Sequence, residues 1–114
     1  MNKISYEGVG EMVVSIGMTE EVTPGEVVRM LDNDLACPCA DGELFCGVAL
    51  KADKVCGSMQ VKGFVTVPYS GESMAVGWMK LAANGMGGVR VNDNGIPMLV
   101  VCKDEDAMTA VICL

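Results

Sequence analysis

The stretch from Gly57 to Gly71 constrains the fold most, because its side chains alternate in character with a period of two. The odd positions carry the apolar set, Met59, Val61, Val65, Val67 and Tyr69. The even positions carry Gln60, Lys62 and Thr66, with Phe64 as the exception. A period of two places alternate residues on opposite faces of a strand, and Pro68 cannot donate to a central ladder. The pattern predicts one central strand that ends at Pro68, with the odd-numbered set on its buried face.

Short strands separated by turns account for the rest of the chain. Turn sequences include Pro24-Gly25, Asp41-Gly42 and Asn92-Asp93-Asn94-Gly95, and they recur about every ten residues. The expected strands cover residues 11–16, 27–31, 35–39, 44–50, 89–91, 96–101 and 107–114. Residues 74–83 fit either a short helix or a strand that enters a glycine-rich hairpin, and Gly77 favours the strand. We therefore expect an all-β fold, either a compact β-sandwich or a small β-barrel of short strands with Gly-rich hairpins and at most one short helix.

Length and charge limit the possible architectures and partners. A chain of 114 residues forms one domain, which we divide into an N-terminal arm or edge segment (1–23) and a β-rich domain (24–114). The formal net charge of −7 disfavours direct nucleic-acid binding, since phosphate backbones repel an acidic protein. The apolar runs are shorter than a membrane helix requires, and we find no signal peptide at the N-terminus.

The six cysteines admit four interpretations. The first is a secreted disulfide scaffold, which the lack of an apolar signal segment at the N-terminus disfavours. Cys102 and Cys113 lie in apolar runs, which favours reduced, buried thiols that act as small hydrophobic residues. A zinc site built from Cys37, Cys39, Cys46 and Cys56 is a weaker possibility, because the spacing of these residues does not match a zinc knuckle. Cys37 and Cys39 would lie on one face of an extended segment and could form a redox pair, although no neighbouring base would lower a thiol pKa.

The sequence lacks the usual catalytic groups. It contains no histidine, the commonest general base, and its carboxylates cluster in turns. The glycines at 85, 87 and 88 lack the strand and helix context of a phosphate-binding loop. We expect no enzyme activity, no metal and no cofactor. Of the ten methionines, Met59, Met98 and Met108 are expected in the core, whereas Met18, Met74, Met79 and Met86 lie nearer loops.

Several segments resemble the head decoration (capsid cement) proteins of tailed bacteriophages and prophages. The resemblance is carried by Gly47-Val48-Ala49, Val61-Lys62-Gly63, the run from Val65 to Gly71, the hairpin from Val76 to Val89, and Leu99-Val100-Val101 before a terminal strand. It covers about Pro24 to Leu114. The first ~23 residues fall outside it, and six cysteines are unusual for such proteins.

This resemblance implies a non-enzymatic structural role on the outer surface of a phage capsid. It implies a homo-oligomer, a trimer, that binds the lattice of the major capsid protein, made in the bacterial cytoplasm and located on the virion. We expect the partner-binding residues in the N-terminal arm, at Ile4, Tyr6, Val9 and Met12, because apolar arms often order on binding. The alternative is a small β-barrel with a ligand-binding or cysteine-dependent redox function.

Overall fold

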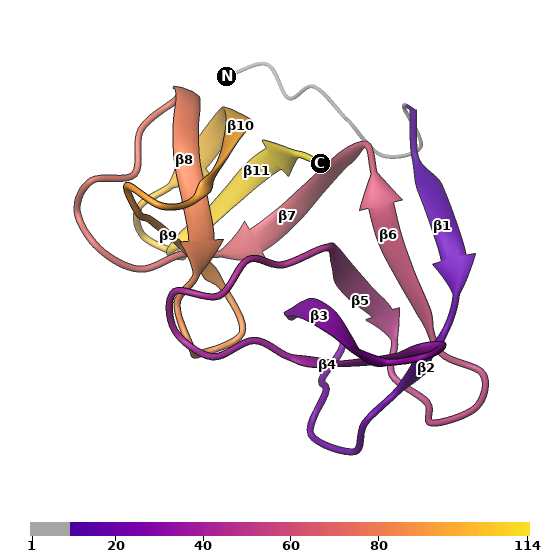
Figure 1. Cartoon of the computed structure of the whole chain (residues 1–114). Helices are drawn as coiled ribbons and strands as arrows, with labels where there is room; N and C mark the ends of the chain where they lie inside the picture. Colours follow the sequence, from indigo (N-terminus) through magenta and orange to yellow (C-terminus); the bar gives the residue numbers. More distant parts are fainter. Residues whose placement is uncertain (1–9) are drawn as a thin grey trace.

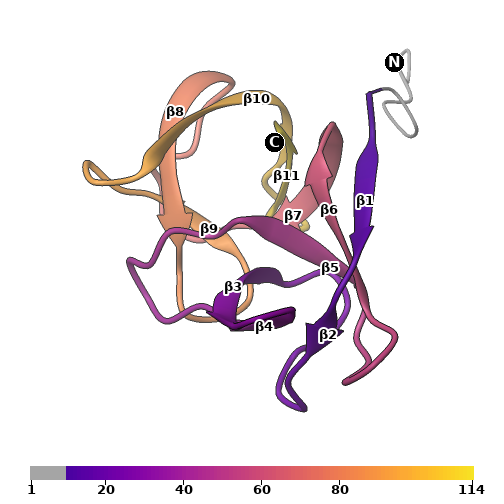
Figure 2. The same ribbon diagram turned by 45° about the vertical axis from the view of Figure 1, so that its right-hand side comes forward.

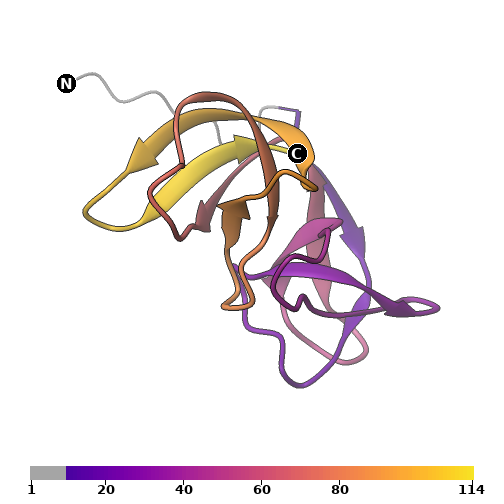
Figure 3. The ribbon, with the colours of Figure 1, turned by 60° about the vertical axis from the view of Figure 1, so that its left-hand side comes forward.

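The computed structural model describes residues 10–114 and is all-β over that range, with no helix among them. The chain forms two sheets that lie at opposite ends of the molecule (Figure 1, Figure 3). The strands are β1 (Met12–Ser15), β2 (Gly17–Met18), β3 (Val27–Asp32), β4 (Leu35–Pro38), β5 (Gly47–Lys51), β6 (Ser58–Lys62), β7 (Phe64–Pro68), β8 (Gly77–Ala83), β9 (Val89–Val91), β10 (Ile96–Asp104) and β11 (Thr109–Cys113). The expected all-β class, consistent with a β-sandwich, is confirmed.

The six-stranded sheet has the order β1-β6-β5-β3-β4-β2. Its neighbours pair antiparallel except β2 and β4, which are parallel. The described part of the segment 1–23 therefore supplies both edges of this sheet, β1 and β2. The β3–β4 turn depends on Asp34, a non-glycine residue with positive φ (57°), a conformation that aspartate tolerates better than most residues.

The five-stranded sheet has the order β7-β11-β10-β8-β9 and is antiparallel throughout. Residues 77–83 of the ambiguous segment 74–83 form β8, so the helical alternative is wrong. The glycine-rich turn after β8 is organised by Asn84, whose Oδ1 accepts the N–H groups of Met86 and Gly88. Gly87 has a φ of +88°, which explains the need for glycine there.

The expected central strand is two strands that belong to different sheets. Residue Gly63 separates β6 from β7 with a φ of +96°, and the chain turns there from one sheet to the other (Figure 1, Figure 2). A Cβ at this position would lie 2.9 Å from Glu11 Cα, so the corner also requires the absence of a side chain. The prediction of one continuous strand is wrong. The bend at Gly63 moves the chain to the other sheet but keeps the alternation of side chains, so the sequence pattern does not reveal it.

The expected polar face of that strand is also wrong at Gln60. This side chain is buried, and its Nε2 donates to the carbonyls of Lys62 and Phe64 at 3.0 Å each. The amide thus bridges the two residues on either side of Gly63. Its polar atoms are satisfied internally, which allows the side chain to be buried.

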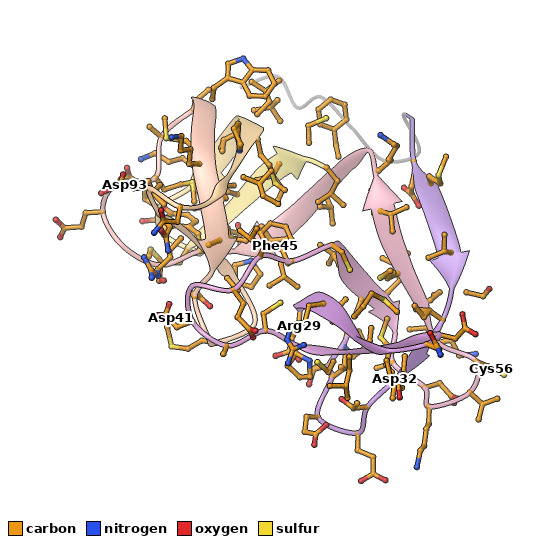
Figure 4. All side chains as sticks on the ribbon, viewed as in Figure 1. Arg29, Asp32, Asp41, Phe45, Cys56 and Asp93 are labelled. Atoms are coloured by element: carbon orange, nitrogen blue, oxygen red, sulfur yellow. The ribbon has the colours of Figure 1, made fainter. Side chains whose placement is uncertain are left out.

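Two hydrophobic clusters form the core. The larger cluster contains most of the inward side chains of the five-stranded sheet, together with Val27, Phe45 and Val48 from the other part of the chain. Phe45 points into the space between the two sheets (Figure 4). The smaller cluster contains Met18, Val22, Val28, Ala36, Ala49 and Met59. The odd-numbered set of the opening stretch is divided between them, with Met59 and Val61 in the smaller cluster and Val65, Val67 and Tyr69 in the larger.

Several expectations about burial are wrong. Strand β5 begins at Gly47, and Leu44 before it is exposed. Cys46, Cys56 and Cys102 are exposed, and Cys113 is only partly buried. Met108, expected in the core, is exposed at the end of the β10–β11 hairpin, with a positive φ of 54°. Met18 and Met74, which lie nearer loops in the sequence, are buried. Met59 and Met98 lie in the core as expected.

Candidate docking edge and neighbouring sites

Strand β1 is the least protected edge among the described strands. The four edge strands are β1, β2, β7 and β9. β2 has only two residues, β7 ends in Pro68, and β9 carries Arg90, which pairs with Asp41 at 2.7 Å. Short edges, proline and charge are the usual means of preventing strand addition. β1 has the sequence Met-Val-Val-Ser, with neither proline nor charge; its protection is limited to its length of four residues and an irregularity in its pairing to β6 between Met12 and Val13.

Both faces of β1 are open as well as its outer edge. Met12 is 52% exposed, Val13 45% and Val14 36%, and Ser15 is also exposed. Successive side chains point to opposite faces of a strand, so the described residues leave part of each face exposed. A partner strand could therefore pair with the backbone of β1 and pack against its apolar side chains at the same time.

The backbone of β1 presents donors to its free edge. The N–H of Ile16 donates to Gly57 O at 2.9 Å, on the side of β6. Because the N–H direction alternates along a strand, Val13 and Ser15 direct their N–H groups away from β6. Such a row of outward groups is the template for β-strand addition.

The expected partner-binding residues lie at or before this strand. Met12 is the first residue of β1, opposite Lys62 of β6. Ile4, Tyr6 and Val9 lie outside the described residues. The sequence did not single out Val13 and Val14; their apolar character was visible, but their exposure follows from the position of β1 at an edge.

The cysteines of the β4 region are a second candidate site. Cys37 and Cys39 are both buried, and Cys46 lies near Cys39 with its Sγ 3.6 Å from Val28 O. Burial, followed by the negative charge of Glu43, raises the pKa of the Cys39 thiol to about 12. A thiol with so high a pKa is almost entirely protonated at neutral pH and is a poor nucleophile.

Acidic and basic side chains surround this region without forming a metal centre. Glu43 Oε1 accepts Arg29 Nε at 3.1 Å and the backbone N–H of Ala40 at 2.6 Å (Arg29 is labelled in Figure 4). Within residues 10–114, no group of three or more histidine, cysteine, aspartate or glutamate side chains has a metal-binding arrangement. Cys56 lies apart on the exposed β5–β6 loop (Figure 4).

A shallow pocket of about 400 Å³ lies where the 70–76 loop meets the β10–β11 hairpin. Its lining consists of Tyr69, Gly71, Glu72, Met74, Lys103, Glu105 and Met108. Lys103 Nζ donates to Met74 O at 3.0 Å and pairs with Glu105 at 2.8 Å. The hydrogen bond with Glu105 raises the pKa of Lys103, and the same bond lowers the pKa of Glu105. The pocket can offer an apolar wall and one ion pair to a small ligand.

No protein-family model matches the chain, and no curated protein matches it closely enough to be a relative. The part of the chain that the structure describes contains no helix long and apolar enough to span a membrane. The candidate surfaces are therefore judged on their own geometry.

Proposed function

We propose that this chain is a non-enzymatic structural protein that binds the outer surface of a tailed-phage capsid as a head decoration protein. The observation that supports the proposal best is the unprotected apolar edge of β1. A domain normally covers or charges such an edge, so an edge with which no described strand pairs favours a protein partner. The family resemblance, which covers about Pro24 to Leu114, supplies the kind of partner.

The proposed mode of binding is β-strand addition. A strand of the capsid protein would pair with β1 through the outward N–H and C=O groups of Val13 and Ser15. Met12 and Val14 would pack against side chains of the added strand on one face, and Val13 on the other. The apolar residues Ile4, Tyr6 and Val9, which precede β1 in the sequence, would extend the contact along the lattice.

A symmetric lattice strengthens such a contact. One short added strand makes few hydrogen bonds, each with a net contribution of about 1 kcal/mol, and binds weakly alone. Several linked copies gain affinity through effective concentration rather than through any single strong contact. The net charge of −7 suits an outward position, away from the packaged nucleic acid.

The test is binding of edge variants to capsids of the phage or prophage whose genome encodes the chain. Val13→Pro removes an outward N–H of β1 without breaking the ladder to β6, and Val13→Thr is the matched control that keeps both the N–H and the β-branched shape. We expect Val13→Pro to reduce co-sedimentation with capsids at least tenfold and Val13→Thr to bind like the wild type. Equal binding of the two variants, with both folded, would exclude strand addition at β1. A failure of the wild-type protein to bind capsids would exclude the decoration role.

The pocket at Tyr69 and Lys103 favours a second function, the binding of a small ligand. Its ion pair and methionine walls suit a small zwitterionic compound with an apolar part. A thermal-shift screen of such compounds, compared between the wild type and Lys103→Met, tests this function. A compound that raises the melting temperature of the wild type alone would support it. The cysteine-dependent redox alternative gains no support from Cys39, whose thiol is buried and has a raised pKa.

A further inference from the structure

The outer face of the five-stranded sheet carries an apolar stripe that the fold does not use. Strand pairing aligns Trp78 of β8 with Leu99 of β10, and Leu99 with Cys113 of β11. The next outward row aligns Cys102 of β10 with Val111 of β11. We call these five residues the outer stripe.

Burial shows that the stripe faces away from the core. The intervening inward residues Val100, Ala110 and Ile112 are fully buried members of the larger cluster. No residue of the stripe belongs to that cluster; Trp78 is 71% exposed and Cys102 is exposed. The other three residues of the stripe, Leu99, Val111 and Cys113, are partly buried. Trp78 is the only tryptophan of the chain, and tryptophan is enriched among the hot-spot residues of protein interfaces.

One charged residue flanks the stripe at each end, and the two charges are opposite. The outward row before Trp78 pairs Lys80 with Pro97. The outward row after Cys102 pairs Asp104 with Thr109. Asp104 Oδ1 accepts the N–H groups of Asp106 and Ala107, which fixes the carboxylate at this end. The two charged rows are three outward rows apart, roughly 20 Å along the strands.

This arrangement is complementary to itself. Consider a second copy placed face to face, related by a two-fold axis that lies in the interface and crosses the strands between the rows of Trp78 and Cys102. The rotation reverses the strand direction, so the row of Lys80 faces the row of Asp104 from the other copy. β8 and β10 are adjacent strands, and a lysine side chain can span the spacing of ~5 Å between them. A two-fold axis parallel to the strands would instead bring like charges together.

We propose that the outer stripe is the interface of a two-fold homodimer, with Trp78 in the row next to the two-fold axis and Lys80 facing Asp104 of the second copy. A tryptophan can bury up to about 250 Å², and Trp78 is 71% exposed, so this residue alone leaves roughly 180 Å² open to a partner. A stable interface buries about 800 Å² per partner, so the stripe would form the apolar centre and the flanking rows the rim. This inference does not rest on capsid binding, and a dimer differs from the trimer that the family resemblance implies.

The first experiment measures the mass of the full chain by analytical ultracentrifugation over a wide concentration range. We expect a reversible dimer, with Trp78→Lys raising the dissociation constant at least thirtyfold, the effect of losing a hot-spot residue. Val55→Lys is the matched control, because Val55 is 82% exposed on the β5–β6 loop, away from the stripe. A monomer at all concentrations, a trimer, or a dimer that tolerates Trp78→Lys would overturn the proposal.

The second experiment tests the charge arrangement and the location of the contact. Lys80→Glu should raise the dissociation constant about fivefold at low salt, whereas Lys51→Glu, the same change on the other sheet, should not. Asp104→Asn, which keeps the oxygen that organises the hairpin, should weaken the dimer to a similar degree. Trp78 fluorescence should become less accessible to acrylamide as the protein concentration rises. If Trp78 is already shielded in a monomer, the rest of the chain covers the stripe and the proposal is wrong.

Discussion

Replacement of Gln60 by methionine tests how the corner between the two sheets is held. Gln60 is 3% exposed, and its Nε2 donates to Lys62 O and Phe64 O, on either side of Gly63. Methionine has a similar length and no branch, so Gln60→Met removes both donors with little change in packing. The two carbonyls lose their partner in a partly buried environment.

The magnitude follows from these two hydrogen bonds. A typical hydrogen bond contributes about 1 kcal/mol net, and a buried acceptor left without a partner costs about 1–3 kcal/mol. The variant regains part of this free energy, because it no longer has to bury the polar amide of Gln60. We therefore expect a decrease of about 2 kcal/mol in the free energy of unfolding. That is a large share of the roughly 5–15 kcal/mol that stabilises a domain of this kind.

Urea unfolding followed by far-UV circular dichroism measures this change. With a slope of about 1–3 kcal/mol per molar urea, the midpoint should fall by roughly 1 M at unchanged slope. Lys62→Met is the control, since Lys62 is exposed on the same strand and its side chain has no part in the bridge. If Gln60→Met and Lys62→Met unfold at the same urea concentration, the amide bridge does not stabilise the corner.

Two further predictions concern the corner and the buried thiol. Gly63→Ala should destabilise the fold by more than about 1 kcal/mol, because alanine is strained at a φ of +96° and its Cβ would meet Glu11. Ser58→Ala on the adjacent strand β6 is the control, and equal urea midpoints of the two variants would contradict the requirement for glycine. For Cys39, the folded-state pKa of about 12 exceeds the unfolded value of about 8.5, so the unfolded chain loses its proton first and the free energy of unfolding falls as pH rises between these values. The difference in unfolding free energy between wild type and Cys39→Ala should therefore decrease above pH ~8.5; a constant difference would show that the thiol titrates normally.

The sequence predicted the strands and turns well wherever local chemistry decides them. Asn92-Asp93-Asn94-Gly95 forms the expected turn, closed by a bond from Gly95 N to Asn92 O. The segment from Gly77 to Ala83 is a strand despite its apolar residues at helical spacing, because an interior glycine and a glycine-rich turn oppose a helix. These features depend on a few neighbouring residues, which is why a single sequence contains them.

The sequence could not show which strands share a sheet. The alternation from Met59 to Tyr69 continues through Gly63, because a single residue at positive φ changes the strand direction without changing the parity of the side chains. Gln60 was assigned to the polar face for the same reason. Its burial depends on the carbonyls of Lys62 and Phe64, which the corner brings within reach.

Exposure was the other property that the sequence could not supply. Val100 and Cys102 lie in the same apolar run, yet Val100 is fully buried and Cys102 is exposed. An apolar run predicts a strand, but only the packing of the sheets decides which of its faces is covered. The candidate docking edge also depends on packing rather than on local sequence. The sequence predicts β1 as a strand, but only the sheet order shows that no described strand pairs with its outer edge.

The corner at Gly63 links the two proposed surfaces and determines how variants should be interpreted. β1 pairs with β6 immediately before the corner, and β7, immediately after it, pairs with β11, which carries Cys113 and Val111 of the outer stripe. A change at Gln60 or Gly63 therefore alters the angle between the docking edge and the stripe. Loss of capsid binding or of dimerisation in such variants cannot identify a contact. Val13 lies opposite Gln60 on β1 and Trp78 lies on β8 of the other sheet, but neither side chain takes part in the corner bonds, so substitutions of these two residues separate the two surfaces.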